Sequence, residues 1–307
     1  MELVATAQFK KAMEKAVAAD AYSRWLVALV HDLTEHEMVD NPLVTESKKD
    51  PAQKKAILLT LSANRGMCGG FNAGVMRLAS HRLQDLRKEF GAVSLEVSGK
   101  RGISAFKFRG ISIDQTYTDL QDKPALESIN DLADHFIKLF LTREIGRLDI
   151  CYVKFDSISR QYPVVETLLP MAELTKSGDV NAIQAAVNVD YKAAAMVRKA
   201  DDAIADGKDI GVAQFKMRDR NTLYEFLPSL ESIVEELIPK AFKAKLFKCF
   251  LDSAVNEQIA RMVAMKSATE SADKMISLLT TAYNRARQSQ ITNEILEIIS
   301  GADALAN

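Results

Sequence analysis

The sequence predicts an α/β protein in which a parallel βαβαβ sheet is joined to a long C-terminal coiled-coil helix. Two observations lead to this prediction. Three short runs rich in apolar and β-branched residues alternate with amphipathic helical patterns, as they do in βαβ units. Beyond them a helical pattern runs almost without interruption from residue 230 to residue 299, which is far longer than a helix of a compact domain.

The composition limits the classes of protein that the chain can belong to. Its 40 basic and 41 acidic residues balance, so the chain has no general attraction to nucleic acid or to anionic membranes. The three cysteines, Cys68, Cys151 and Cys249, are too far apart for a metal knuckle and odd in number, which is typical of a reducing cytoplasm. Neither a membrane-spanning apolar stretch nor a signal peptide is visible, so any membrane association is expected to be peripheral.

The N-terminal half is predicted to contain one long helix, a linker and the sheet. Apolar residues recur at steps of three and four from residue 1 to about residue 36, which predicts a single helix. Residues 39–51 are polar and contain proline, as linkers do. Three strands are expected at 56–63, 94–100 and 149–157, with helices at 69–90 and 128–145. Parallel strands joined by such helices form right-handed crossovers, so the helices should cover the faces of the sheet.

The C-terminal half is predicted to be helical. Residues 171–224 are polar and rich in alanine, with a helical pattern over 182–207. In the long pattern that follows, Pro239 should kink the helix or separate two helices. Apolar residues form a coiled-coil seam there, with one break in register: Val255, Ile259, Met262, Ala272, Met275, Leu279, Ala282, Ala286, Ile291, Ile295 and Ile298. About sixty helical residues span about 90 Å, so this helix must leave the globular body.

The stretch "SANRGMCGGFN", residues 62–72, stands where the first strand turns into its helix. Gly66, Gly69 and Gly70 do not have the spacing of a dinucleotide fingerprint, and no P-loop lysine follows them. We therefore interpret the stretch as a tight-packing turn, with nucleotide binding as the alternative. Cys68 is expected to be a buried packing thiol, with a reactive thiol as the alternative.

Other candidate sites have weaker patterns. His31, Glu35 and His36 match no zinc-binding motif, so we interpret them as a solvated helix end rather than a metal site. No nucleophile motif is present, and the sequence predicts no bound cofactor. Arg287 and Gln288 lie on the protruding helix, where carboxylates of a partner could meet them, with a solvated helix face as the alternative.

Three stretches together carry a resemblance to a known family. Residues 1–12, the glycine stretch at 62–72 and the fifty residues at 256–305 are similar to the gamma subunit of rotary F-type ATP synthases. The resemblance implies a Rossmann-like domain without a nucleotide site and an antiparallel coiled coil formed by the N- and C-terminal helices. It implies that the glycines of the turn, which also contains Arg65 and Cys68, allow close backbone approach.

The function implied by the resemblance is mechanical rather than catalytic. Proton flow would turn a membrane ring and the attached gamma subunit, which changes the conformation of the catalytic beta subunits. The implied partners are the alpha, beta and epsilon subunits and the c-ring, without nucleic acid, at the cytoplasmic face of a bacterial inner membrane. By resemblance, Met1 and Lys266 lie near the beta lever arms, and Arg287, Gln288 and Thr292 engage beta loops.

The chain also departs from the family pattern. Asn64 replaces the usual aspartate, and 171–224 is longer than usual. About twenty residues that usually precede the methionine matching Met1 are missing, which implies an upstream start or a shaft with one helix in its upper half. The expected segments are 1–50, 51–170, 171–228 and 229–307. The alternatives to a rotor subunit are a coiled-coil adaptor and a nucleotide-dependent Rossmann enzyme.

Overall fold

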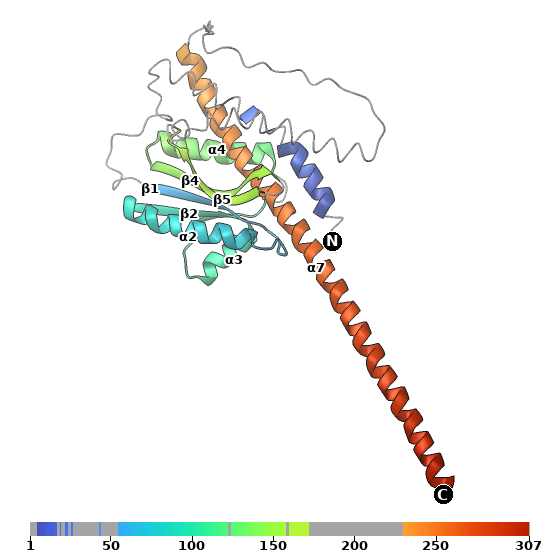
Figure 1. The fold of residues 1–307 in the computed structure, drawn as a ribbon. Helices are drawn as coiled ribbons and strands as arrows, with labels where there is room; N and C mark the ends of the chain where they lie inside the picture. Colours follow the sequence, from blue (N-terminus) through green and yellow to red (C-terminus); the bar gives the residue numbers. More distant parts are fainter. Residues whose placement is uncertain are drawn as a thin grey trace, which may run out of the picture.

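The computed structural model describes residues 5–16, 19, 22–23, 26, 43, 55–121, 124–157, 160–171 and 230–306. Several sequence-based predictions fall outside these residues: the role of Met1, the cluster at 31–36, most of the linker at 39–51, and the helix at 182–207. Within the described residues the chain forms one five-stranded sheet, four helices around it and a helical N-terminal segment, residues 5–16 (Figure 1).

The sheet has the strand order β3-β2-β1-β4-β5. β1 (Lys55–Leu61) pairs in parallel with β2 (Ala92–Ser98) and with β4 (Ile145–Ser157), which confirms the three predicted strands and their direction. Two strands were not predicted. β3 (Gln115–Tyr117) extends the parallel part of the sheet, and β5 (Arg160–Leu169) pairs antiparallel with β4.

The helices cover both faces of the sheet, as expected. α2 (Phe71–Glu89) and the unpredicted α3 (Lys100–Phe108) pack on one face, and α4 (Leu126–Leu141) and α7 (Leu230–Ala306) on the other (Figure 1). Successive side chains of a strand point to opposite faces, so β1 contributes to both cores. Its odd-numbered apolar residues pack with α4 and α7, whereas Ala56 and Leu58 pack with α2.

Two helix boundaries differ from the prediction. The helix expected at 128–145 ends at Leu141, because Arg143 adopts a positive φ of 60° and the next strand begins at Ile145. Pro239 does not separate two helices, since α7 continues through it as one helix of 77 residues. Pro239 has no backbone N–H, so the helix loses one hydrogen bond there. The helix does not end at this point, because the neighbouring residues Ile238 and Ala241 are packed in the core.

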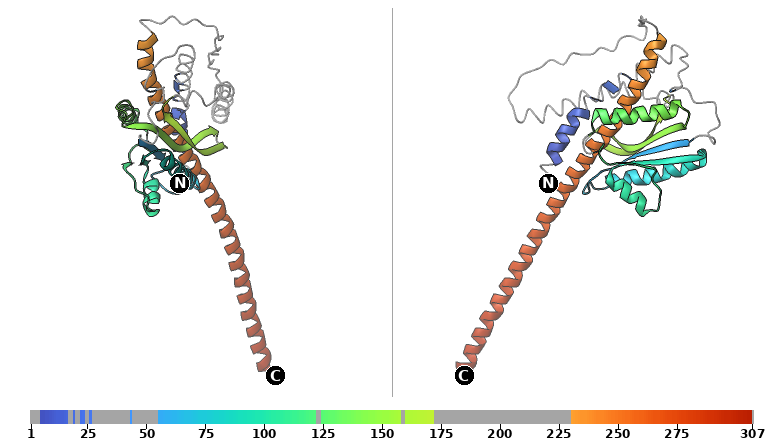
Figure 2. Two further views of the ribbon diagram at one scale, coloured as in Figure 1. Left: turned by 90° about the vertical axis from the view of Figure 1, so that its left-hand side faces the viewer. Right: turned by 180° about the vertical axis from the view of Figure 1, so that it is seen from behind.

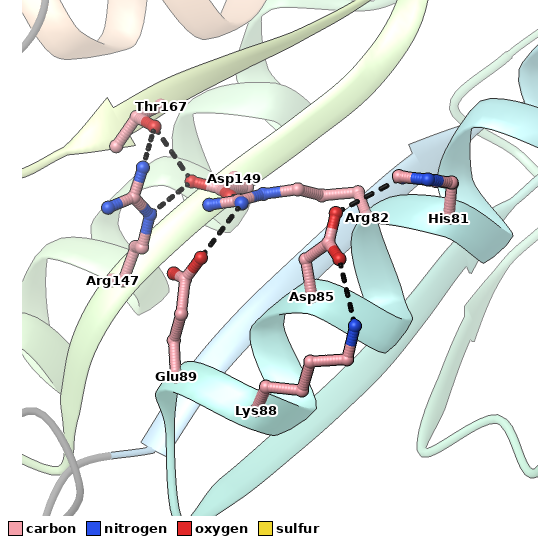
Figure 3. A network of polar contacts seen from close by, with 8 residues as sticks. All are labelled: His81, Arg82, Asp85, Lys88, Glu89, Arg147, Asp149 and Thr167. Carbon is pink, nitrogen blue, oxygen red and sulfur yellow. Dashed lines mark hydrogen bonds and ion pairs between the residues drawn. The ribbon is translucent and has the colours of Figure 1, made fainter.

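A buried ionic network ties α2 to the sheet (Figure 3). The Asp149 side chain on β4 is fully buried and pairs with Arg82 of α2 at 2.7 Å and with Arg147 at 2.9 Å. The Thr167 hydroxyl on β5 donates to the same carboxylate at 2.9 Å. A buried charge needs such partners, because an unpaired one would not be stable in the interior.

The long helix leaves the α/β domain, as its length predicts. Its residues up to Ile259 contribute to the core, whereas the side chains from Ser267 to Ala302 are exposed. The N-terminal segment runs beside α7 in the opposite direction (Figures 1 and 2). Their contact is a small apolar cluster of Met13, Ala16, Leu251, Val255 and Ile259. Val255 and Ile259 are the first two residues of the predicted coiled-coil seam.

Candidate functional site

The glycine turn connects β1 to α2 at the carboxyl edge of the sheet. Asn72, in the first turn of α2, closes it with both ends of its side chain. Its Oδ1 accepts from the Ala63 N–H at 3.0 Å, and its Nδ2 donates to the Cys68 sulfur at 3.1 Å. The Cys68 side chain is only 3% exposed. Burial, and then the nearby Glu257 carboxylate, raise the pKa of the Cys68 thiol, which favours the interpretation of Cys68 as a packing thiol.

The roles of the glycines differ from the expected one. A Cβ added at Gly69 or Gly70 would meet no heavy atom of the described chain within 4 Å. Gly69 instead supplies a positive φ of 53°, which side-chain-bearing residues rarely adopt. Gly66 faces the guanidinium of Arg101, which would lie 2.7 Å from an added Cβ. Close approach is therefore not seen at Gly69 and Gly70 among the described residues, and at Gly66 the approaching group is an arginine side chain.

Close approach occurs instead at Gly99 and Gly102, which sequence reasoning missed. A Cβ at Gly99 would lie 1.9 Å from the Ser62 carbonyl oxygen, and one at Gly102 would lie 2.4 Å from the Ser62 hydroxyl. The Ser62 hydroxyl donates to the Ser98 carbonyl at 2.7 Å and accepts from the Gly102 N–H at 2.9 Å. These glycines thus let the start of α3 pack directly against the turn after β1. The sequence signal that could have revealed this contact is the pair Gly99 and Gly102, at the end of the second predicted strand.

Asn64 has a role that the usual aspartate cannot reproduce. Its Oδ1 accepts from the Lys100 N–H at 3.0 Å, and its Nδ2 donates to the Thr118 carbonyl at 2.8 Å. A carboxylate could accept the first hydrogen bond but has no proton for the second. Asn64 therefore links the glycine turn to α3 and to the segment after β3.

A groove of about 390 Å³ lies between the glycine turn and α7. Cys68, Gly69 and Gly70 form one wall with Gln161 of β5, and α7 forms the other with Ile259, Ala260, Val263, Ala264 and Ser267. Arg261 of α7 reaches across to the turn, with its Nε 3.5 Å from the Gly66 carbonyl oxygen, and pairs with Glu257 at 2.6 Å. The turn therefore stands where the long helix leaves the domain.

The other predicted site residues lie along the exposed part of α7. Lys266, Arg287, Gln288 and Thr292 are all exposed. The Thr292 hydroxyl donates to the Gln288 carbonyl at 2.9 Å, one helical turn away. Large apolar side chains accompany them: Ile291 is 47% exposed and Ile298 is 72% exposed. The described part of α7 beyond the domain thus presents both charged and apolar groups.

Neither a metal-binding cluster nor a membrane-spanning helix is found among the described residues. No group of three histidine, cysteine or acidic side chains within them could hold a metal ion. Among the helices of the described ranges, none is apolar over a stretch that could cross a bilayer.

Comparison with known proteins identifies the family. The family model described as ATP synthase matches residues 1–305. The ATP synthase gamma chain of Rhodopirellula baltica is 44% identical over 306 residues, which cover 99% of this chain and 92% of that protein. This chain belongs to the ATP synthase gamma chain family.

Solved structures agree with this gamma chain fold. A chain in the central stalk and c-ring structure of the Tetrahymena thermophila mitochondrial ATP synthase superimposes with a TM-score of 0.52 at 16% identity, covering 87% of this chain and 99% of that chain. A chain in the Euglena gracilis mitochondrial OSCP, F1 and c-ring structure gives 0.51 at 17% identity, covering 99% and 94%. As a gamma chain, this protein is a non-catalytic rotor subunit of the central stalk, which decides against the enzyme and adaptor alternatives.

Proposed function

We propose that this gamma chain transmits rotation between a proton-driven c-ring and the catalytic beta subunits, at the cytoplasmic face of a bacterial inner membrane. The observation that supports this proposal is the division of α7 into a half fixed in the α/β domain and a half whose side chains are exposed. The exposed half is the part that can enter a ring of alpha and beta subunits. The α/β domain, with the epsilon subunit, would stand on the membrane ring.

Rotation couples the catalytic sites only if the shaft contacts each beta subunit differently at each angle. Arg287 and Gln288 are suited to such contacts, because Arg287 has no ion pair with the described residues and both side chains are exposed. An arginine fork can bind a carboxylate of a beta loop through two hydrogen bonds. Thr292 lies one turn beyond Gln288 and extends the same polar face. By the family resemblance, Lys266 and Met1 would lie nearer the beta lever arms.

The tip of the helix is suited to a bearing, that is, to apolar contacts that allow rotation, rather than to contacts that are specific for one angle. Ile291, Ile295, Ile298 and Ile299 are each about half exposed or more and are spaced along the last turns. Apolar contact is not directional, so an apolar sleeve around these residues would hold the axis without holding one angle.

The test is the Arg287→Ala/Gln288→Ala double variant, assembled with the matching alpha and beta subunits. We expect the ATP hydrolysis rate of the complex to fall severalfold while the helical content of the subunit is unchanged, because both residues are exposed. Asp273→Ala/Lys274→Ala is the matched control, since these charged residues are exposed on the same helix. Equal turnover of the double variant and the control would refute the assignment of Arg287 and Gln288 as contacts of the beta subunits.

A further inference from the structure

The half of α7 inside the domain carries buried polar side chains that face the sheet. Ser253 and Asn256 are fully buried, although this part of the helix could pack with apolar residues alone. Polar groups in such positions lose their contact with water and require protein partners. Their partners come from the α/β domain and not from α7 itself.

The first connection is ionic. The Lys245 ammonium of α7 lies 2.8 Å from the Glu166 carboxylate on β5, and Lys154 of β4 lies 3.4 Å from the other oxygen of the same carboxylate. Burial alone would raise the pKa of Glu166, but the two lysines hold it at about 2. Glu166 is therefore ionised at neutral pH, and α7 is joined to both strands of the β4–β5 hairpin.

The second connection consists of neutral hydrogen bonds. The Gln121 amide, just after β3, donates to the Ser253 hydroxyl at 2.9 Å, and the Asn256 amide donates to the Val153 carbonyl at 2.7 Å. The oxygens of both amides have no hydrogen-bond partner among the described residues. Such half-satisfied amides contribute little to the free energy of unfolding, because the unpaired oxygen offsets the bond that is made. Stability alone does not account for them.

These contacts are spread over an arc of about 160° around α7. At 100° per residue, Lys245 and Asn256 lie about 20° apart around the helix axis, and Ser253 about 80° from Lys245. Lys243, which pairs with Asp134 of α4 at 2.7 Å, lies about 160° from Lys245. Contacts on several sides of a helix resist its rotation in both senses. Hydrogen bonds depend strongly on angle, so the polar contacts add angular restraints to the apolar packing of α7.

We propose that Glu166, Gln121, Asn256 and their partners form a polar clamp that fixes the angle of the shaft in the α/β domain. The clamp is a positioning device for the rotor and does not touch the catalytic sites. It makes the joint between domain and shaft stiff to torsion, so that torque applied to the domain reaches the exposed half of α7 with little angular lag. Buried polar groups are best attested in such register-setting roles.

The experiment measures the torsional stiffness of this joint in an assembled complex of gamma with alpha and beta subunits. The tip of α7 is held in the alpha–beta ring, a probe is attached to the α/β domain, and stiffness is obtained from its thermal angular fluctuations. The test variant is Glu166→Gln/Asn256→Leu, in which both residues keep their approximate size. We expect its stiffness to fall about twofold, because the variant removes the carboxylate charge from the Lys245 contact and the hydrogen bond of the Asn256 amide. Unloaded ATP hydrolysis should stay unchanged.

The matched control is Asp149→Asn. It changes a buried carboxylate with two arginine partners, but those partners lie on α2 and β4 and not on α7. A loss of stiffness confined to the clamp variant supports the proposal. Unchanged stiffness in the clamp variant, or an equal loss in the control, would overturn it.

A second measurement decides the case if the double variant does not assemble. Spin labels on the exposed positions 138 of α4 and 275 of α7 report the distribution of distances between domain and shaft in the full chain. The single variant Asn256→Leu should broaden this distribution, whereas Asp149→Asn should leave it as in the unaltered chain. Identical distributions for all three proteins would equally overturn the proposal.

Discussion

Replacement of Asp149 by alanine should destabilise the α/β domain far more than replacement of any exposed carboxylate of α2. The Asp149 side chain is fully buried and has contacts of 2.7 Å with Arg82, 2.9 Å with Arg147 and 2.9 Å with the Thr167 hydroxyl. Asp149→Ala removes the carboxylate that the two guanidinium groups share. Each of them would then be partly buried with less compensation of its charge.

The magnitude follows from how much compensation is left. Breaking a buried ion pair by removing one partner costs about 3–5 kcal/mol. Arg82 keeps a contact of 3.4 Å with Glu89, Arg147 keeps a hydrogen bond of 2.7 Å to Thr167, and both arginines are 19% exposed. We therefore expect the lower limit, about 3 kcal/mol, which corresponds to a fall in Tm of about 6–12 °C for a domain of this size.

Asp85 supplies the matched control, because it lies in the same region and also has two partners (Figure 3). It contacts His81 at 3.1 Å and Lys88 at 3.6 Å, but its side chain is 35% exposed and water can replace both partners. Asp85→Ala should cost less than about 1 kcal/mol. Thermal unfolding followed by circular dichroism and calorimetry compares the two variants. If both lower Tm equally, burial is not what makes the Asp149 network stabilising.

Three further outcomes are expected. In the folded protein the pKa of Glu166 is about 2, below its ordinary value of 4.5. The contribution of the Glu166 carboxylate to the free energy of unfolding is therefore complete above pH 4.5 and is lost as the pH falls toward 2. In acid titrations, the difference in stability between the unaltered chain and Glu166→Gln should vanish across that window. Gly99→Ala should cost about 3 kcal/mol or more in urea unfolding, because φ is 97° and the Ser62 backbone blocks the Cβ. In the isolated chain, amides of 272–299 should exchange with solvent faster than those of 240–265, since the former are exposed; equal slow exchange in a monomer would contradict this.

The central part of the sheet was predictable because its strands are buried on both faces. β1 is an almost continuous apolar run, and apolar runs between glycine-containing turns indicate such strands. The edges were not predictable. β3 has three residues without an apolar pattern. β5 is mostly half-buried and contains Pro163, which weakens the strand signal of its run and is tolerated at the edge of a sheet. An edge strand is determined by its neighbour more than by its own residues.

The position of the glycine turn was predictable, but the purpose of each glycine was not. A cluster of glycines between a strand and a helix is visible in the sequence, and it does lie at the start of α2. The crowded glycines, Gly99 and Gly102, are crowded by Ser62, which belongs to the previous βα connection. Only the parallel pairing of β1 with β2 places these connections side by side. The polar clamp was missed for the same reason, since each of its members acquires its partner through tertiary structure.

The two halves of α7 belong to one continuous helix but make different kinds of contact. Its 77 residues span about 115 Å, so a single rigid element can pack on one face of the sheet and end far from it. Inside the domain, polar residues such as Asn256 add directional bonds to the apolar packing, and the angle is fixed. At the tip, apolar residues such as Ile298 are exposed, and contacts there do not select an angle. The proposed clamp would hold the shaft inside the domain, and the exposed apolar residues of the tip suit the proposed bearing at the other end.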